Sequence, residues 1–347
     1  MKLLRRLVVL TNGIFIIFLI LGYLRQFIDP GNAAFLTIFS LLYPYIVIAL
    51  LISMILLVLV RSRFAWISLL ALVLTSGNTI RQIGFHVQPQ VPDDSTIYTI
   101  TTLNIKNNFR HNQQDQSSVF IKKFKEKSPT FLALQEVSGD RIFGIARQLG
   151  YPYHSHLKKP EQEGFLAIFS KFPMFDVQTI RNSEGRVIAL FADIKIPQGM
   201  FRLVNIHLHT NAVTVRAGKF SPESFSRKEG LKAFNDMLKS YGDNASLRLE
   251  EIELIQSNIE NSPFPVILAG DANDTPYSPV YLKLADSMQN AFVKGGLGFA
   301  QTYNGLLIPL KIDHIFLDQP FTIFNTLIEK IEFSDHNPIT TSFTLQN

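Results

Sequence analysis

The sequence predicts an α/β domain over residues 98–347, preceded by membrane-spanning helices. Two observations carry this prediction. Residues 1–89 contain three long runs without a charged residue, and from Tyr98 onward short strand-like apolar runs alternate with helical patterns. The composition agrees, because the 347-residue chain is 47% hydrophobic and only 18% charged, whereas soluble domains carry about 25% charged residues. The chain therefore combines an apolar N-terminal region with a C-terminal domain of ordinary composition.

The absence of cysteine excludes several classes of protein. Because the chain has no Cys, disulfide scaffolds, Cys-ligated zinc, iron–sulfur clusters and thiol catalysis are ruled out. The net charge is +5, and residues 1–89 hold seven Lys and Arg against one acid, Asp29, which leaves a net charge of −1 for the rest. The basic excess thus lies beside the apolar runs. It indicates contact with a membrane and carries no information about nucleic acid.

The apolar runs predict about three transmembrane helices in residues 1–83. The runs are residues 7–24, 30–60 and 64–80, and a spanning helix needs roughly 20 apolar residues. A cleaved signal peptide would explain the first run but not the second. The third run ends in polar residues and glycine, so a buried or interfacial helix is the alternative there. No acid or base lies within the runs, which favours an anchor over a transport path.

Basic residues in the short connections predict the orientation of these spans. Lys2, Arg5 and Arg6 precede the first run, and Arg61 and Arg63 separate the second run from the third. Three spans with both basic clusters in the cytoplasm place the following domain outside it, whereas two spans would leave that domain inside. We expect an integral protein of a bacterial inner membrane with an extracytoplasmic domain.

The remaining chain is divided by composition into a linker and one domain. Residues 84–97 are polar, with prolines and paired acids, and are predicted to be a linker between an anchor (1–83) and the domain (98–347). Runs rich in Val, Ile, Thr and Phe predict strands, and longer amphipathic patterns predict helices. The expected strands are Tyr98–Ile105, Phe131–Gln135, Leu166–Ser170, Val187–Ile194, Arg202–His207, Val266–Ala269, His314–Leu317 and Ile339–Thr344. The expected helices are Gln116–Lys127, Asp140–Leu149, Ser226–Lys239, Ala245–Ile259 and Pro279–Asp286.

Polar side chains fall at the ends of the expected strands, where loops carry function. Each has an ordinary explanation when it is taken alone: a solvated glutamate, a surface histidine, a turn or a cap. As a set they combine hard oxygen ligands with two histidines, a chemistry that favours Mg²⁺ or Mn²⁺. The residues are Asn104, Glu136, His207, Asp271 with Asn273, Asp313, and Asp335 with His336.

Short motifs surround these residues in a fixed order along the chain. They are TLNIKNN at Thr102, LQEV at Leu134, GFLAIFSKFPM at Gly164, NIHLHT at Asn205, GDANDTPYSP at Gly270, QTYNG at Gln301, KIDHIF at Lys311 and SDHNPI at Ser334. Together they resemble the endonuclease/exonuclease/phosphatase superfamily, which includes pancreatic deoxyribonuclease, abasic-site endonucleases, neutral sphingomyelinases and inositol-polyphosphate phosphatases. The GDxN and SDHxP elements form a specific pair. Apolar N-terminal runs before such a domain also resemble a membrane-anchored bacterial branch.

The resemblance implies a fold and a metal site. The fold is α/β (α+β), a four-layer sandwich of two facing mixed β-sheets flanked by helices, with one site at the rim of both sheets. Glu136 would be the principal ligand of Mg²⁺ (or Mn²⁺), assisted by Asn104 and Asp335. The ion would polarise a non-bridging phosphate oxygen.

The resemblance also implies catalytic roles. His336 would contact the scissile phosphate or activate water, with Asp313 fixing its tautomer. Asp271 and Asn273 would position the nucleophile and the phosphate. His207 would stabilise charge on phosphorus or protonate the leaving group. Whether Asp271 or His336 is the base stays open.

The expected function is a membrane-anchored, Mg²⁺-dependent phosphoesterase that hydrolyses phosphodiester bonds, of the nuclease type. The alternative is a lipid head-group or small-molecule phosphoesterase, because the anchor favours lipid and the net charge of −1 after residue 89 disfavours tight DNA binding. A second alternative is a non-catalytic, membrane-tethered binding module, against which the complete motif set speaks. The expected partners are the membrane and a phosphate ester, either nucleic acid or a lipid head group.

Overall fold

The chain forms two compact units in a computed structural model that describes residues 2–31, 34–86, 96–111, 114–155, 166–210, 227–305 and 309–346. The first unit comprises Met1–Gln82, Asn211–Leu247 and Thr275–Leu282. The second comprises Ile83–Thr210, Arg248–Asp274 and Lys283–Asn347. Most of the expected linker, residues 87–95, lies outside the described residues. Each unit is considered by itself.

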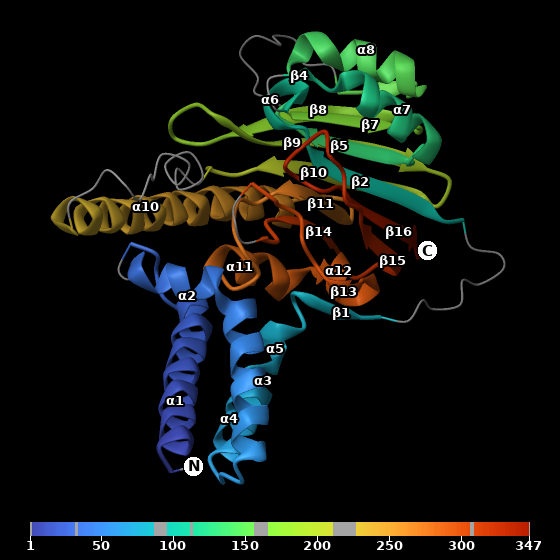
Figure 1. Ribbon diagram of the computed structural model, residues 1–347. Coiled ribbons are helices and arrows are strands. Elements are labelled where there is room, and N and C mark those ends of the chain that lie inside the picture. Colours follow the sequence, from blue (N-terminus) through green and yellow to red (C-terminus); the bar gives the residue numbers. More distant parts are fainter. Residues whose placement is uncertain are drawn as a thin grey trace. The chain divides into compact units, whose positions relative to one another are not determined.

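The first unit is built on apolar helices that lie side by side (Figure 1). Pro44 lies in the first turn of α3, a place where its missing N–H costs no hydrogen bond. The helices are α1 (Lys2–Leu24), α2 (Thr37–Leu41), α3 (Tyr43–Leu59), α4 (Ala65–Leu74) and α5 (Ser76–Thr79), with short 3₁₀ turns at Arg25–Phe27 and Ala34–Leu36.

One buried polar cluster ties three of these helices together. Asn12 of α1 donates to the hydroxyl of Ser53 in α3 (3.0 Å) and accepts from the hydroxyl of Ser68 in α4 (2.9 Å). All three side chains are buried. In an apolar bundle such hydrogen bonds hold helices at a fixed rotation and depth.

The described helices only partly follow the three expected spans. One helix, Lys2–Phe27, is long and apolar enough to cross a membrane, and the pair Ala34–Leu41 and Tyr43–Leu59 passes the same test together but is bent by 60°. The third run gives the ten-residue apolar helix α4 and then the short polar helix α5, because the sequence after Leu74 turns polar. The number of spans and the boundaries 1–83, 84–97 and 98–347 stay predictions.

The basic residues that set the expected orientation gather at one end of the first unit. The N-terminus of α1 and the turn between α3 and α4 lie at the same end (Figure 1). A cavity of about 590 Å³ at this end is lined by Lys2, Arg5, Arg6 and Phe64, together with Val9 and Leu10. The fold therefore brings both sequence clusters to one face.

The second unit contains two six-stranded mixed sheets, which confirms the expected α+β fold of two facing sheets flanked by helices. Each sheet has one parallel pair, β10 with β11 and β2 with β5, among antiparallel neighbours. The first sheet runs β12 (Gln289–Asn290), β14 (Asp313–Leu317), β11 (Val266–Asp271), β10 (Gly199–His207), β9 (Val187–Ile196), β8 (Met174–Arg181). The second runs β15 (Phe321–Ile328), β16 (Ile339–Leu345), β2 (Tyr98–Asn104), β5 (Phe131–Gln135), β7 (Leu166–Ser170), β6 (Tyr153–His154).

The main core lies between the facing sheets. Ile100, Phe131 and Ile168 of one sheet pack with Leu190 and Phe201 of the other, and the rings of Phe131 and Phe201 meet edge to face with centroids 5.2 Å apart. A strand that is covered on both faces has a sequence that is apolar at nearly every position. That pattern made Phe131–Gln135 and Leu166–Ser170 predictable to the residue.

Helices cover the outer faces of the sheets. Phe120 and Phe124 of α7 (Ser117–Lys127) and Ile142 of α8 (Gly139–Leu149) pack with Leu132 and Leu134 of β5, and Figure 1 shows α7 and α8 together on that side. On the other sheet, Ile252 and Ile255 in the second half of α10 (Arg227–Glu260) are buried. The remaining described elements are α6 (Lys106–Phe109), α11 (Pro279–Ser287), α12 (Ala291–Gly295) and two small ribbons, β1 (Ile83–Phe85) with β13 (Leu297–Phe299) and β3 (Arg110–His111) with β4 (Gln114–Asp115).

The structure differs from the expected elements in two ways: two expected helices are one helix, and two strands were not expected. The helices expected at Ser226–Lys239 and Ala245–Ile259 are one helix, α10, that begins at Arg227. Gly242 does not break it, because this glycine is packed so closely that an added Cβ would lie 2.4 Å from the Cβ of Ala34. The strands β8 and β15 were not anticipated. Both are edge strands with bulges and interspersed polar residues, which blur the strand periodicity.

Candidate active site

Strand register brings the predicted site residues to one rim of the second unit. In the first sheet His207 pairs with Asp271, and Asp271 pairs with Asp313, so three neighbouring strands end in polar side chains in one row. In the second sheet Asn104 ends β2 beside Gln135 of β5, directly before Glu136. The hydroxyl of Ser334 donates to the carbonyl of Asn104 (2.8 Å) and so fixes the segment 334–336 beside the end of β2.

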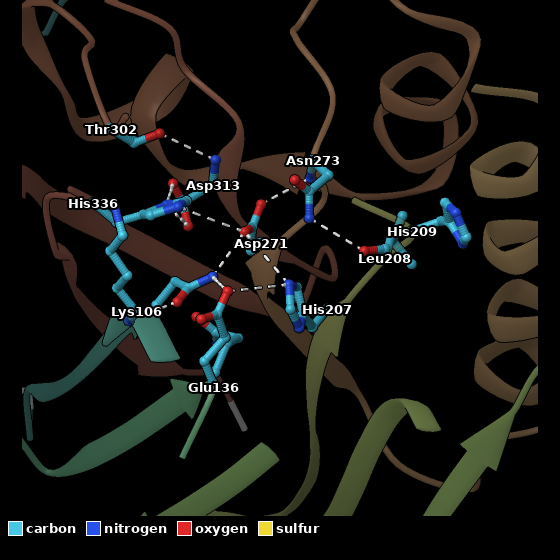
Figure 2. Close-up of polar contacts among 12 residues, drawn as sticks. Lys106, Glu136, His207, Leu208, His209, Asp271, Asn273, Thr302, Asp313 and His336 are labelled. Atoms are coloured by element: carbon cyan, nitrogen blue, oxygen red, sulfur yellow. Dashed lines mark hydrogen bonds and ion pairs between the residues drawn. The ribbon is translucent and has the colours of Figure 1, made fainter. Parts of the chain in front are cut away.

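Glu136 and Asn104 face the first sheet across the rim. Asn104 Nδ2 donates to Glu136 Oε1 (3.0 Å) and to Asp271 Oδ2 (3.1 Å), so one amide bridges a carboxylate of each sheet. Glu136 has φ +60°, a left-handed conformation that non-glycine residues adopt rarely and that gathers at functional sites. The turn directs this carboxylate toward the rim instead of along the strand (Figure 2).

His336 and Asp313 form a buried pair. His336 Nδ1 lies 2.9 Å from Asp313 Oδ2, which makes Nδ1 the protonated nitrogen and leaves Nε2 facing Asp271 at 3.9 Å (Figure 2). Burial alone would lower the pKa of His336, but the carboxylates of Asp313 and Asp271 outweigh it and raise the pKa to about 10. Thr302 accepts from the backbone N–H of Asp313 (3.1 Å), and the ring of Tyr303 packs on the imidazole.

Asp271 occupies the centre of the rim. Its Oδ1 accepts from the backbone N–H of Asn273 (2.8 Å), while Asn273 Nδ2 donates to the carbonyl of Leu208 (3.1 Å). Burial, and then the charge of Asp313, raise the pKa of Asp271 to about 7. Gly270 must be glycine, because it has φ +146° and an added Cβ would lie 2.1 Å from the carbonyl oxygen of Ile206.

His207 approaches the same carboxylate from the other side. Its Nε2 lies 3.8 Å from Asp271 Oδ2 and 3.9 Å from Glu136 Oε1. Burial lowers the pKa of His207 to about 4, against the opposing charge of Glu136. The ring of His209 lies apart from this group (Figure 2).

The residues at the rim fit a hard divalent cation. The carboxylates of Glu136 and Asp335 are oxygen donors of the kind that Mg²⁺ and Mn²⁺ prefer. The amide oxygen of Asn104 accepts from the backbone N–H of Lys106 (2.9 Å), while its Nδ2 faces Glu136. Asp335 Oδ1 is buried with no hydrogen-bond partner among the described residues, and its Oδ2 pairs with Lys106 Nζ. A second group, Asp271, Asp313 and His336, also has its ligand atoms within 4.8 Å of one another. The ligand set stays a prediction.

Sequence reasoning missed a buried polar network behind the rim. Arg248 of α10 donates to Asp274 Oδ2 (3.1 Å) and to the carbonyl of His209 (3.3 Å). Glu251, one turn later, accepts from the backbone N–H of His209 (2.7 Å) and pairs with Arg186 (3.2 Å). The helix thus holds the loop ends that carry His207 and Asn273. The available signal was the placement of two charges on the same helix face as buried Ile252 and Ile255.

A second missed feature links the two sheets beneath the site. Asn205 of β10 donates to the carbonyls of Leu134 (2.8 Å) and Ala167 (2.9 Å), and its Oδ1 accepts from Gln135 (2.6 Å). All these groups are buried. Both residues stood within quoted motifs, NIHLHT and LQEV, but nothing in the sequence shows that they meet.

Two facing mixed sheets whose rim gathers carboxylates, an amide and a His–Asp pair define a metal-dependent phosphoesterase class of protein. A family model described as the Endonuclease/Exonuclease/phosphatase family matches residues 101–336, more than half of the chain. The chain belongs to this family, as the motifs had indicated, and is accordingly a metal-dependent phosphoric ester hydrolase. A second model, a domain of unknown function, matches residues 5–82. No curated protein matches the chain.

Solved structures share the fold at low identity. An endonuclease/exonuclease/phosphatase from Bacteroides vulgatus is 18% identical with a TM-score of 0.52, covering 72% of this chain and 100% of that chain. A functionally unknown conserved protein from Enterococcus faecalis is 16% identical over the same shares, with a TM-score of 0.52. TDP2 from D. rerio, solved with a single-strand DNA product, is 15% identical with a TM-score of 0.52, covering 72% and 99%. These similarities concern the fold.

Proposed function

We propose that this protein is a membrane-anchored phosphodiesterase of the nuclease type. The observation that carries the proposal is the convergence of two imidazoles, Nε2 of His207 and Nε2 of His336, on one carboxylate oxygen of Asp271, at 3.8 and 3.9 Å. This arrangement offers a base and proton-carrying groups around one point, as hydrolysis of a phosphate ester requires. A similar fold is described with a single-strand DNA product in D. rerio TDP2, which supports nucleic acid as the substrate class.

The proposed metal ligands are Asn104, Glu136 and Asp335. A bound Mg²⁺ or Mn²⁺ supplies a Lewis acid for a phosphate oxygen. Glu136 is half-buried at the rim, whereas Asp271 and Asp313 are fully buried. This difference favours Glu136 as the ligand that faces an ion.

The proposed roles of the other residues follow from their contacts. Asp313 accepts from Nδ1–H of His336 and holds the ring so that Nε2–H faces the substrate position. Water attacks phosphorus with loss of a proton to Asp271, whose pKa of about 7 suits a base, and the ester P–O bond breaks. The leaving oxygen takes a proton from His336, which a pKa of about 10 keeps charged, while His207, with a pKa of about 4, contacts the phosphate as a neutral imidazole. Asn273 keeps Asp271 oriented through its backbone N–H.

A second candidate substrate is a lipid head group. The observation that favours it is the first unit, whose helix Lys2–Phe27 has the length and hydropathy of a membrane span. An enzyme held at a bilayer meets phospholipid at high local concentration. We propose that this unit anchors the protein in a bacterial inner membrane with the second unit on the extracytoplasmic side.

The test is an activity assay on the full chain in detergent with bis-p-nitrophenyl phosphate, a plasmid and a short-chain phospholipid. We expect turnover with Mg²⁺ or Mn²⁺, none with EDTA, and a faster reaction with the plasmid than with the lipid. His336→Ala and Asp313→Asn should each reduce the rate about 10²–10⁴-fold, the usual contribution of a positioned acid or base. Glu332→Gln, at an exposed position, is the matched control and should keep the parent rate.

The outcomes separate the candidates. Preference for the phospholipid would replace the nuclease proposal with the head-group candidate. Full activity in His336→Ala would remove that residue from the mechanism. A folded protein that turns over none of the substrates with either ion would favour the binding-module alternative.

A further inference from the structure

A small ribbon of the second unit presents an apolar face to solvent. Strand β1 pairs with β13 in antiparallel register, Ile83 opposite Phe299 and Phe85 opposite Leu297. Because side chains alternate along a strand, these four residues share one face. Phe85 is 69% exposed, Leu297 75% and Phe299 42%. Large apolar side chains that gather on one exposed face mark a contact surface.

The opposite face of this ribbon is closed against the unit itself. Gly84 points to that side, where an added Cβ would lie 2.2 Å from the carbonyl oxygen of Gly296. The same carbonyl accepts from the backbone N–H of His86 (3.0 Å). Gly84 therefore allows a contact that any side chain would block. The hydrogen bond extends the ladder of the ribbon itself, and the buried Gly84 lies on the side away from the apolar face.

The position of the ribbon in the chain indicates what covers its apolar face. The last helix of the first unit ends at Thr79, and the exposed Ile80 follows it directly. Ile83 follows Ile80 by three residue steps, so at the limit of about 3.6 Å per residue the ribbon begins at most about 11 Å from Ile80. This reach follows from the covalent chain alone. If the run from residue 64 to 80 crosses the bilayer, Ile80 lies at its boundary and the ribbon starts within this reach of it.

We infer that the apolar face of the β1–β13 ribbon, formed by Ile83, Phe85, Leu297 and Phe299, rests in the interfacial layer of the membrane that holds the first unit. This inference rests on the proposed membrane anchoring. Polar head groups add several ångströms to each side of the hydrocarbon core, and aromatic and aliphatic side chains bind at that boundary.

The absence of cysteine makes a direct test available. A single cysteine is introduced into the full chain as Leu297→Cys and carries an NBD fluorophore, and the protein is reconstituted in phosphatidylcholine–phosphatidylglycerol vesicles with or without nitroxide-labelled lipid. We expect a blue-shifted emission and loss of fluorescence when the nitroxide is near the head groups. Phe143→Cys, 67% exposed on α8 of the same unit, is the matched control and should keep an aqueous emission without quenching.

A third label separates this inference from the anchoring proposal. Leu70→Cys lies at an exposed position of α4 in the first unit and reports whether that unit is in the bilayer. Quenching at positions 70 and 297, but not at 143, is the expected result. Quenching at 70 without quenching at 297 would overturn the ribbon contact and leave the anchor standing. Absence of quenching at 70 would overturn the anchor and the inference with it.

Discussion

Asp313 and His314 are neighbours in β14 with opposite tasks. Strand alternation turns Asp313 toward the rim, where it holds His336 (2.9 Å), and turns His314 into the protein, where Nε2 donates to the carbonyl of Asp274 (3.1 Å). The first carries chemistry and the second supports the loop that follows Asn273. The two adjacent residues thus act on opposite faces of one strand.

At the same residue scale, His314 predicts a pH dependence of stability. Burial, and then the charge of Lys311, lower the pKa of His314 to about 3, whereas the unfolded histidine titrates near its ordinary value of about 6.5. Between these pH values the unfolded chain binds one more proton, so the free energy of unfolding falls as pH falls, by at most about 1.4 kcal/mol per pH unit. The stability that neutral, buried His314 contributes is fully present above about pH 6.5 and is lost as the pH falls toward 3.

The measurement is the urea midpoint of unfolding of the second unit between pH 7 and pH 5. Pulse proteolysis of the full chain monitors the unfolding. His314→Gln keeps a donor for the Asp274 carbonyl but does not titrate. We expect the stability difference between parent and variant to shrink as pH falls. Parallel pH curves for the two proteins would show that His314 is not the group responsible.

At the scale of elements, α10 links the core to the catalytic loops. Its buried Arg248 and Glu251 hold His209 and Asp274, the residues that follow His207 and Asn273 by one or two positions. Without such partners, the loops that follow these strand ends would be exposed to solvent. The helix supplies the charged partners that fix them.

Replacement of Arg248 should therefore affect both stability and catalysis. Arg248→Ala leaves the buried Asp274 carboxylate without this partner, which we expect to cost about 3–5 kcal/mol of unfolding free energy. Arg248→Lys restores the charge but not the fork-shaped guanidinium, so it should recover most of the stability while kcat stays reduced at an unchanged KM. The urea midpoint and steady-state kinetics measure the two effects.

The control is Glu250→Gln, an exposed position on the same helix, which should change the free energy of unfolding by less than about 0.5 kcal/mol. If Arg248→Lys showed parent kinetics, the helix would support the fold alone. If Arg248→Ala were as stable as the parent, the buried pair would have no net role.

At the scale of the whole molecule, the question is the side of the membrane on which the second unit works. Both basic clusters of the first unit lie at one end of its helices, and the proposal places that end in the cytoplasm. The side of the second unit then depends on whether the run from residue 64 to 80 crosses the bilayer.

Single cysteines in the cysteine-free chain resolve this topology. We expect Phe143→Cys to react with a membrane-impermeant maleimide in intact spheroplasts and Arg63→Cys, exposed between α3 and α4, to react only after lysis. Reaction of both positions only after lysis would mean two spans and a cytoplasmic second unit. Slower migration of the modified protein on a gel shows which cysteine has reacted.

Much of the fold was predictable because its signals are local. Phe131–Gln135 and Leu166–Ser170 are buried on both faces, so their apolar runs mark the strand ends. Edge strands such as β8 and the continuity of α10 through Gly242 were not predictable, since bulges and a close helix contact override local periodicity.

The sequence by itself determined the family and the residues that meet at the rim, because motif order and spacing are properties of the linear chain. Only the tertiary structure decided the register that sets His207, Asp271 and Asp313 in one row, and the contacts of Asn205 and Arg248 behind them. These contacts join segments far apart in the sequence. Their partners are chosen by packing and burial in three dimensions, which leave no local trace in the order of residues.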